Sequence, residues 1–429
     1  MLIELEKKFN VIYPDNENAT YDSILNYSTE KDSPFQRWYR YKEGFSIQFI
    51  DKIIEEYSDG NIKKLLDPFC GSGTTILAAN KHGCQGIGFE VNPFSFFLTK
   101  IKQDYYSLEE VDVFKNEYEQ IISSLVKYEL ENYTLPKLSI SGKVFQDEAE
   151  KVMMSCKVKI DSVENVKVRN LLLLGWLASI EELSDYRKAG NGLKKRKTVK
   201  PIYVKKDDVI NRLQLQYKQM YVDLVNRTNS KVENFLFNRS CLDFADIIQH
   251  ESIDGIIFSP PYANCFDYTE IYKLELWFGE FVKEYADLKV LRNKSLKSHL
   301  NIKYSQDEEA ILESDVLVDR INRIKQSELW DKRIPMMLSG YFKDMYNVID
   351  SAYKTLRPGG FCAIVVGNSA YSGVVVPTDL ILAEYAERIG FCVDKIEVDR
   401  FIITSSQQYE KTKHDGKFLR ESVICLIKK

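Results

Sequence analysis

Residues 64–90 constrain the fold more than any other part of the chain. Residues 64–69 predict a short buried strand, and the Gly-Ser-Gly that follows predicts a tight turn. A helix is expected from Thr74 to His82, and a second strand at residues 86–90 ends on the acid Glu90. This order opens a doubly wound α/β sheet, in which ligands bind beyond the carboxyl ends of the strands. We therefore expect a nucleoside site at this edge.

The same alternation of strands and helices resumes in the second half of the chain. A strand at residues 255–258 runs directly into Ser-Pro-Pro-Tyr, and a long helix at residues 341–356 precedes a strand at residues 361–366. Two last strands, around residues 393–398 and 422–427, are expected to form an antiparallel pair at one edge.

Between these parts the chain leaves the α/β pattern. Apolar residues at helical spacing, around residues 111–125 and 210–224, predict a mostly helical insertion. We expect an N-terminal segment at residues 1–58 with a helix next to the nucleoside site, a catalytic core at residues 59–102 and 235–429, and the insertion at residues 103–234. Residues 279–335 predict a second, irregular insertion within the core.

Composition excludes several classes of protein. The chain of 429 residues is 44% hydrophobic and 28% charged, as in globular proteins, and its net charge of -4 excludes a protein that is basic throughout. Eight cysteines never form a C-x-x-C pair and only four histidines are present, so neither a zinc site nor a disulfide framework is expected. The N-terminus lacks a basic region followed by an apolar run, and we expect a cytoplasmic protein without a membrane span.

Three acids indicate the kind of ligand. Asp67, directly before the turn, would repel a pyrophosphate but attract a sulfonium or an ammonium group. This disfavours a nicotinamide oxidoreductase. Glu90 suits the two hydroxyls of a ribose. Asp243 is either an acceptor for an adenine amino group or a solvated turn residue.

The motif Ser259-Pro260-Pro261-Tyr262 has residues suited to the transfer of a group to a base amine. Consecutive prolines have no N–H and fix φ, so the local carbonyls are held as acceptors. The Ser259 hydroxyl and the Pro260 carbonyl can bind the two hydrogens of a base amine and direct its lone pair at an electrophile. The Tyr262 ring offers a stacking surface for a base drawn out of a duplex. The alternative is a Pro-Pro turn covered by an aromatic ring.

Together these motifs resemble those of S-adenosylmethionine-dependent DNA amino-methyltransferases. Residues 67–75 resemble that family's cofactor loop, and Ser-Pro-Pro-Tyr resembles its catalytic motif in the N4-cytosine form. The resemblance implies a mostly parallel seven-stranded sheet with one antiparallel edge strand, transfer to N4 of a flipped cytosine without a metal, and DNA, presumed double-stranded, as partner. A cognate restriction endonuclease encoded separately is a further expected partner. The implied cofactor residues are Lys42, Gly44, Phe45, Asp67, Pro68, Phe69, Gly71, Ser72, Gly73, Thr74, Thr75, Glu90 and Asp243, and the implied catalytic residues are Ser259, Pro260, Pro261 and Tyr262.

Two runs of the chain, residues 187–206 and 289–303, contain several Lys and Arg residues and no acid. They are expected to contact phosphates. Gly190-Asn191-Gly192 predicts that the first run is a flexible loop. The residues expected to bind DNA are Arg187, Lys188, Lys194, Lys195, Arg196, Lys197, Arg292, Lys294 and Lys297.

Alternative functions remain open at this point. They are N6-adenine methylation of DNA, methylation of a guanine amino group in RNA, and an inactive nucleic-acid-binding module. Cys265 lies three residues beyond the Ser-Pro-Pro-Tyr motif and is expected to be a buried structural thiol rather than a nucleophile.

Overall fold

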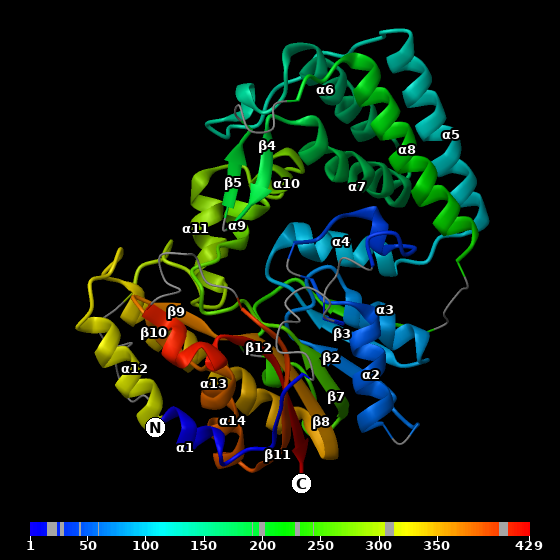
Figure 1. Cartoon of the computed structure of the whole chain (residues 1–429). Helices are drawn as coiled ribbons and strands as arrows, with labels where there is room; N and C mark the ends of the chain where they lie inside the picture. Colours follow the sequence, from blue (N-terminus) through cyan, green and yellow to red (C-terminus); the bar gives the residue numbers. More distant parts are fainter. Residues whose placement is uncertain are drawn as a thin grey trace.

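The chain folds into a lobe built on a large sheet and a second, helical lobe, as Figure 1 shows for a computed structural model of the protein. The two lobes are connected through α4 (Pro93–Gln103) and through the segment that follows the last residues of β7 (Ile253–Phe258). The structure describes residues 1–14, 24–25, 30–42, 44–58, 60–190, 192–196, 202–227, 232–242, 244–304, 313–402 and 411–429.

The central sheet confirms the predicted α/β fold, and all of its strands but β12 run in the same direction. Within the described residues it has eight strands, because a two-residue β1 extends it beside β11. The antiparallel strand β12 lies between β8 and β11 and not at the edge of the sheet, with β11 as its predicted antiparallel partner. In spatial order the strands are β1 (Val11–Ile12), β11 (Phe391–Phe401), β12 (Arg420–Lys428), β8 (Leu356–Gly367), β7, β2 (Lys64–Asp67), β3 (Gln85–Phe89) and β6 (Phe235–Phe237).

Helices cover both faces of the sheet because the side chains of a strand alternate between them. In β8, Ala363 and Val365 pack with α2 (Ile47–Tyr57) and α3 (Thr74–Lys81). Cys362, Ile364 and Val366 pack on the other face, with the helices α12 (Asp315–Lys325), α13 (Ile334–Thr355) and α14 (Thr378–Arg388).

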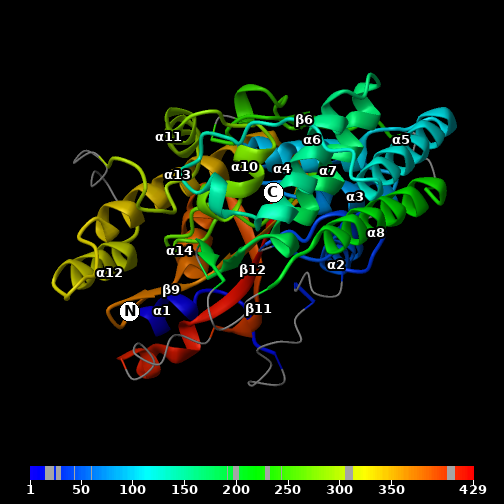
Figure 2. The same cartoon turned by 90° about the horizontal axis from the view of Figure 1, so that it is seen from above.

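The helical lobe has its own hydrophobic core. The predicted helical insertion is confirmed, and the helices that follow Ser-Pro-Pro-Tyr share this core, so residues 266–291 pack with the insertion. Figure 2 shows this lobe from above. Its elements are α5 (Leu108–Val126), α6 (Asp147–Asp161), α7 (Val166–Leu183), β4 (Tyr186–Ala189), β5 (Gly192–Lys195), α8 (Lys206–Val225), α9 (Tyr268–Ile271), α10 (Lys273–Phe278) and α11 (Tyr285–Lys294).

Two predicted irregular segments are structured. Residues 187–189 and 192–195, part of the run at residues 187–206 expected to be a flexible loop, form strands of the antiparallel β4–β5 hairpin, and Gly190 next to β4 has φ +57°. The stretch at residues 279–335 contains α11 and α12. Only Leu288 and Leu291 of α11 are buried, so its helical period is weak in the sequence.

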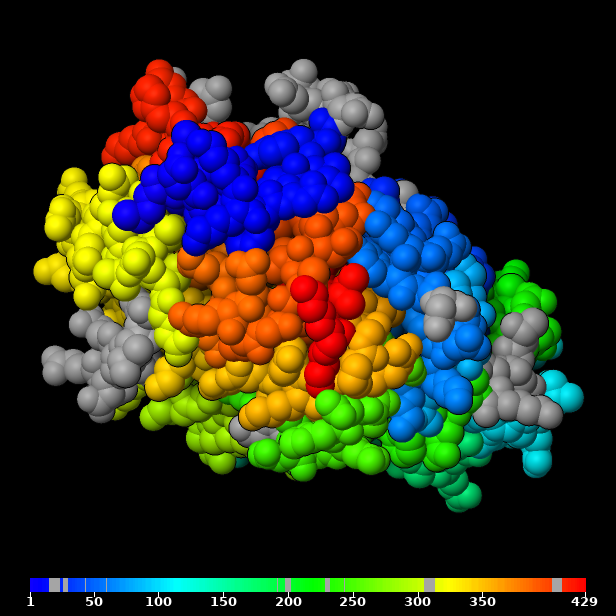
Figure 3. Space-filling view, turned by 90° about the horizontal axis from the view of Figure 1, so that it is seen from below, coloured from blue at the N-terminus to red at the C-terminus, as the bar shows by residue number. Residues whose placement is uncertain are grey.

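The N-terminal segment lies at the β11 edge of the sheet. In Figure 3 this blue segment lies across orange residues of the C-terminal half. Strand β1 pairs in parallel with β11, and Glu6 of α1 (Leu2–Glu6) accepts from the guanidinium of Arg420 at 2.6 Å. The remaining short elements are η2 (Gln36–Trp38), η3 (Ser141–Lys143), η4 (Phe244–Asp246), β9 (Ser369–Tyr371), β10 (Val374–Val376) and η6 (Lys413–Phe418).

Among the helices in the described ranges, none has both the length and the apolar character that crossing a bilayer requires.

Candidate active site

The side chain of Asp67 fixes the shape of the glycine loop at residues 67–75. Its buried carboxylate accepts from the Thr75 hydroxyl at 2.5 Å and from the Phe69 amide at 2.9 Å. Burial raises the pKa of Asp67 to about 7 despite these two donors. Gly71 and Gly73 have φ of +49° and +79°, and a Cβ at Gly73 would lie 2.7 Å from the Thr99 side chain. The carboxylate therefore ties the two ends of the turn together.

A buried lysine that sequence reasoning did not select supports the same loop. The Lys102 ammonium donates to the Ser72 carbonyl at 3.1 Å and to the Gln36 side-chain carbonyl at 2.9 Å. The Gln36 amide in turn donates to Thr74 Oγ1 at 3.1 Å. Burial lowers the pKa of Lys102 to about 7. A lysine within the amphipathic α4 gives no sequence signal for this role.

Glu90 holds the ends of two neighbouring strands together. It follows β3 and accepts from the Gly71 amide at 2.9 Å and from the Asn92 amide at 2.7 Å. Burial raises the pKa of Glu90 to about 7, and the nearby Asp67 carboxylate raises it further. Its carboxylate also lines a cavity at the carboxyl edge of the sheet.

This cavity, which we call the nucleoside cavity, brings together most of the predicted cofactor residues. Gly44, Phe45, Pro68, Phe69, Gly71, Ser72, Thr74 and Glu90 line it. Asp67, Gly73 and Thr75 are not part of its wall and act by shaping the loop, whereas Lys42 lines the neighbouring cavity. Asp243 lies outside the described residues.

The neighbouring cavity, which we call the base cavity, has a volume of about 630 Å³. Ser259, Pro260 and Tyr262 line it, whereas Pro261 faces the nucleoside cavity. The walls of the two cavities share Tyr41, Gly44, Phe45, Ser259 and Tyr268. The two cavities therefore adjoin at these residues, Ser259 among them.

An ion pair that sequence reasoning missed holds Tyr262 in the base cavity. The Tyr262 hydroxyl donates to Glu421 Oε1 at 2.5 Å, and Arg400 donates to Glu421 Oε2 at 2.5 Å. The ring packs against Gly367, where a Cβ would lie 2.7 Å from it. Arg400 and Glu421 are partners in the β11–β12 register. The sequence does not reveal a pair of residues joined only by that register.

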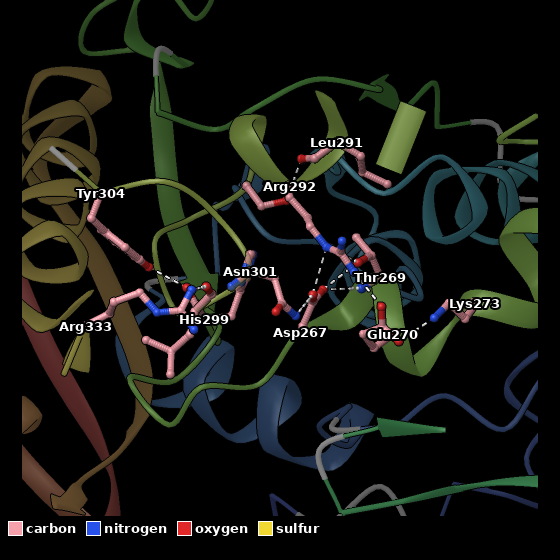
Figure 4. A network of polar contacts seen from close by, with 12 residues as sticks. Asp267, Thr269, Glu270, Lys273, Leu291, Arg292, His299, Asn301, Tyr304 and Arg333 are labelled. Carbon is pink, nitrogen blue, oxygen red and sulfur yellow. Dashed lines mark hydrogen bonds and ion pairs between the residues drawn. The ribbon is translucent and has the colours of Figure 1, made fainter. Parts of the chain in front are cut away.

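A polar network next to the nucleoside cavity contains a predicted DNA-binding residue (Figure 4). Arg292 donates to Asp267 at 2.9 Å and to Glu270 at 2.6 Å, and Asn301 donates to Asp267 at 2.7 Å. Asp267 and Lys294 line the cavity, together with the segment up to His299. Arg292 therefore connects α11 to the segment that carries Ser-Pro-Pro-Tyr, and this position does not suit a phosphate contact.

Replacement of Arg292 by alanine is therefore expected to weaken binding of S-adenosylhomocysteine about tenfold, because hydrogen bonds to charged groups contribute roughly 1.5–3 kcal/mol. The salt dependence of DNA binding should stay at its wild-type slope. Calorimetry measures the first quantity and fluorescence anisotropy the second. Asn293→Ala, an exposed and uncharged change on the same helix, is the control and should alter neither. A reduced salt slope in Arg292→Ala would return this residue to the DNA interface.

Some of the other predicted DNA-binding side chains are bound by groups of the protein, whereas others are exposed to solvent. Lys188 is buried against Glu275, Arg196 donates to the backbone carbonyls of Ser184 and Glu181, and the Lys297 ammonium lies 3.5 Å from Asp344. Lys194 and Lys195 are exposed on β5, and Arg187 is half-buried on β4. Lys197 lies outside the described residues.

The surroundings of Cys265, near the Ser-Pro-Pro-Tyr motif, do not activate its thiol as a nucleophile. Burial raises the pKa of Cys265, and its sulfur lies 3.6 Å from the Tyr371 hydroxyl. In the described part of the chain, no three His, Cys, Asp or Glu side chains gather in a group able to hold a metal ion.

The pKa of Glu90 predicts a pH dependence of cofactor affinity. If Glu90 accepts from ribose hydroxyls, as the sequence predicts, binding favours the ionised carboxylate, which loses its proton near pH 7. The affinity for S-adenosylhomocysteine should be highest above about pH 8 and fall about tenfold per pH unit below pH 7. Titration calorimetry from pH 5.5 to 8.5 measures it, with Glu90→Gln as the control. An unchanged profile in that variant would assign the dependence to another group.

Comparisons with known proteins agree with this arrangement. A family model described as DNA methylase matches residues 6–100. The Type II methyltransferase M.AvaI of Nostoc sp. (strain PCC 7120) is 31% identical over 433 residues, which cover 93% of this chain and 88% of the relative. The Type II methyltransferase M.BsoBI of Geobacillus stearothermophilus is 29% identical over 445 residues, covering 92% and 86%. The Type II methyltransferase M.MvaI of Kocuria varians is 21% identical over 394 residues, covering 86% and 84%.

Proposed function

We propose that this chain, which belongs to the S-adenosylmethionine-dependent Type II DNA methyltransferases, transfers the methyl group to the N4 amine of a cytosine flipped out of duplex DNA. The observation that carries the proposal is the position of Ser259 in the wall shared by the nucleoside cavity and the base cavity. A cytosine amine beside Ser259 would lie next to the cofactor's methyl group.

The nucleoside cavity suits the cofactor on the chemistry of its own residues. Glu90 offers carboxylate oxygens to ribose hydroxyls, and Gly71 and Ser72 bring backbone close to the ligand without large side chains. When bound, S-adenosylmethionine supplies an electrophilic methyl group on a positively charged sulfur. We propose Gly44, Phe45, Pro68, Phe69 and Thr74 as further contacts.

The residues of the base cavity would prepare the amine for attack. The Ser259 hydroxyl and the Pro260 carbonyl accept its two hydrogens, so that the nitrogen lone pair points at the methyl carbon. The new N–C bond forms as the methyl–sulfur bond breaks and its electron pair stays on sulfur. The amine then loses a proton to water. Tyr262 stacks on the base, held by Glu421.

Cytosine is favoured over adenine by Ser259, because the motif with serine at this position is typical of N4-cytosine enzymes, whereas N6-adenine enzymes more often carry Asp or Asn there. N6-adenine methylation of DNA is the second candidate, since it needs the same fold and the same amine acceptors. By analogy with the Type II relatives, we propose a separately encoded restriction endonuclease as a partner in the same system.

Expression in a bacterial host that lacks N4-methylcytosine tests this proposal. Genomic DNA from the expressing cells is digested to nucleosides and analysed by mass spectrometry. We expect N4-methylcytosine in cells with the wild-type protein and much less of it in cells with Ser259→Ala or Tyr262→Ala harvested at the same time after induction. New N6-methyladenine without N4-methylcytosine would replace the first candidate by the second.

A further inference from the structure

Lys188 fixes the β4–β5 hairpin to the wall of the site. Its ammonium lies 2.5 Å from Glu275 of α10 and 2.6 Å from the Tyr39 hydroxyl, with side-chain exposures of 6% for Lys188 and 1% for Glu275. The Tyr39 and Tyr272 rings lie 5.0 and 5.2 Å from the ammonium. Tyr39 itself lines the base cavity. The hairpin is thus anchored beside the place where we expect the flipped base.

The opposite face of the hairpin carries positive charge, and the hairpin has no acidic residue to neutralise it. Arg187 of β4 and Lys194 of β5 are register partners, so their side chains lie on the same face, opposite to that of Lys188 and Leu193. Like charges directly opposite each other destabilise a strand pair. An anionic partner between or beside them would remove this repulsion.

The position of the hairpin restricts what that partner can be. Strand β5 packs against α9, which begins six residues after the motif ends at Tyr262. In Figure 1 the hairpin extends from the helical lobe toward the lobe that contains the sheet. A two-stranded ribbon fits the major groove of duplex DNA, and this hairpin lies beside the base cavity, to which the duplex would deliver a base.

We propose that the β4–β5 hairpin is a duplex-contacting element in which Arg187 and Lys194 bind phosphates while Lys188 serves only as its anchor. This inference rests on the proposed function, because it takes duplex DNA as the substrate. The basic residues of the hairpin thus have two different roles. Lys188 is neutralised inside the protein by Glu275, whereas Arg187 and Lys194 interact with the DNA backbone.

Salt-dependent DNA binding of the full-length protein tests the outward pair. The double variant Arg187→Ala/Lys194→Ala should bind a mixed-sequence duplex at least about tenfold more weakly at low salt. Its plot of log K against log salt should lose about 1.8 from the wild-type slope, since each phosphate contact contributes roughly 0.9. Lys63→Ala/Lys354→Ala is the matched control, because it removes the same charge from exposed positions at the amino ends of β2 and β8. An unchanged slope in Arg187→Ala/Lys194→Ala would overturn the proposal.

A second variant tests the anchor. Lys188→Met/Glu275→Met removes both partners of the buried pair and keeps the net charge, which avoids leaving an unpaired buried charge. Its salt slope should equal that of the wild type. A slope smaller by about 0.9 would make Lys188 a phosphate contact and overturn the division of roles.

The product nucleoside separates this inference from the proposed function. N6-methyladenine in place of N4-methylcytosine would contradict the proposed base and leave the hairpin result standing. A wild-type protein that binds no duplex DNA would overturn both.

Discussion

Tyr262→Ala is expected to lower kcat about a hundredfold or more while changing the affinity for S-adenosylhomocysteine less than about twofold. The ring lies in the base cavity and has no part in the wall of the nucleoside cavity. Stacking on an aromatic ring contributes roughly 1–3 kcal/mol per base, and a misplaced reactant can cost about another hundredfold. Single-turnover methylation of plasmid DNA and calorimetry with the cofactor product measure the two quantities.

Two matched variants show how the ring is held. Tyr262→Phe keeps the stacking surface and loses the hydrogen bond to Glu421 together with the long one that the Ser259 hydroxyl donates at 3.5 Å, so its turnover should fall about tenfold or less. Glu421→Gln keeps an acceptor for the hydroxyl and should retain more activity than Glu421→Ala. If Tyr262→Ala lost cofactor affinity to the same extent as turnover, the assignment of the two cavities would be wrong.

Glu90→Ala is expected to weaken binding of S-adenosylhomocysteine about 10- to 100-fold. The variant loses the proposed ribose acceptor and also the bonds from the Gly71 and Asn92 amides that hold the two strand ends together. Hydrogen bonds to a charged group contribute roughly 1.5–3 kcal/mol each, which sets this range. Calorimetry at pH 8 measures the change, with duplex DNA affinity expected to remain at the wild-type value.

Glu90→Gln is the matched variant, since it retains one side-chain oxygen as an acceptor and should bind more tightly than Glu90→Ala. Circular dichroism would show whether either change disturbs the fold. Unchanged cofactor affinity in folded Glu90→Ala would place the ribose elsewhere.

The sequence predicted the parts of this molecule that depend on local patterns. The strand and the glycine turn after it were recognisable because Asp67, Gly71 and Gly73 occur in one short stretch. The helix expected within residues 1–58 is α2, and its apolar residues Phe49, Ile50, Ile53 and Ile54 are all buried. The sequence also placed the β11–β12 pair correctly as antiparallel neighbours.

Features formed by distant residues were not predictable in this way. Arg292 and Lys188 have the same local sequence environment as exposed cations, and only tertiary packing brings them to Asp267 and Glu275. The two-residue β1 was missed because a strand this short carries no periodic signal. Asp67 was expected to face the cofactor, but its carboxylate is turned into the loop, where it accepts from Thr75.

The central claim is that the base cavity presents a cytosine amine to the methyl group at Ser259. Its most direct test is to incubate the purified protein with S-adenosylmethionine labelled in the methyl group and unmethylated plasmid DNA, and then to digest the DNA and separate the nucleosides. The label should appear in N4-methylcytosine and be reduced about a hundredfold or more with Tyr262→Ala in the same incubation time. Label in N6-methyladenine, or only in added RNA, would contradict the claim.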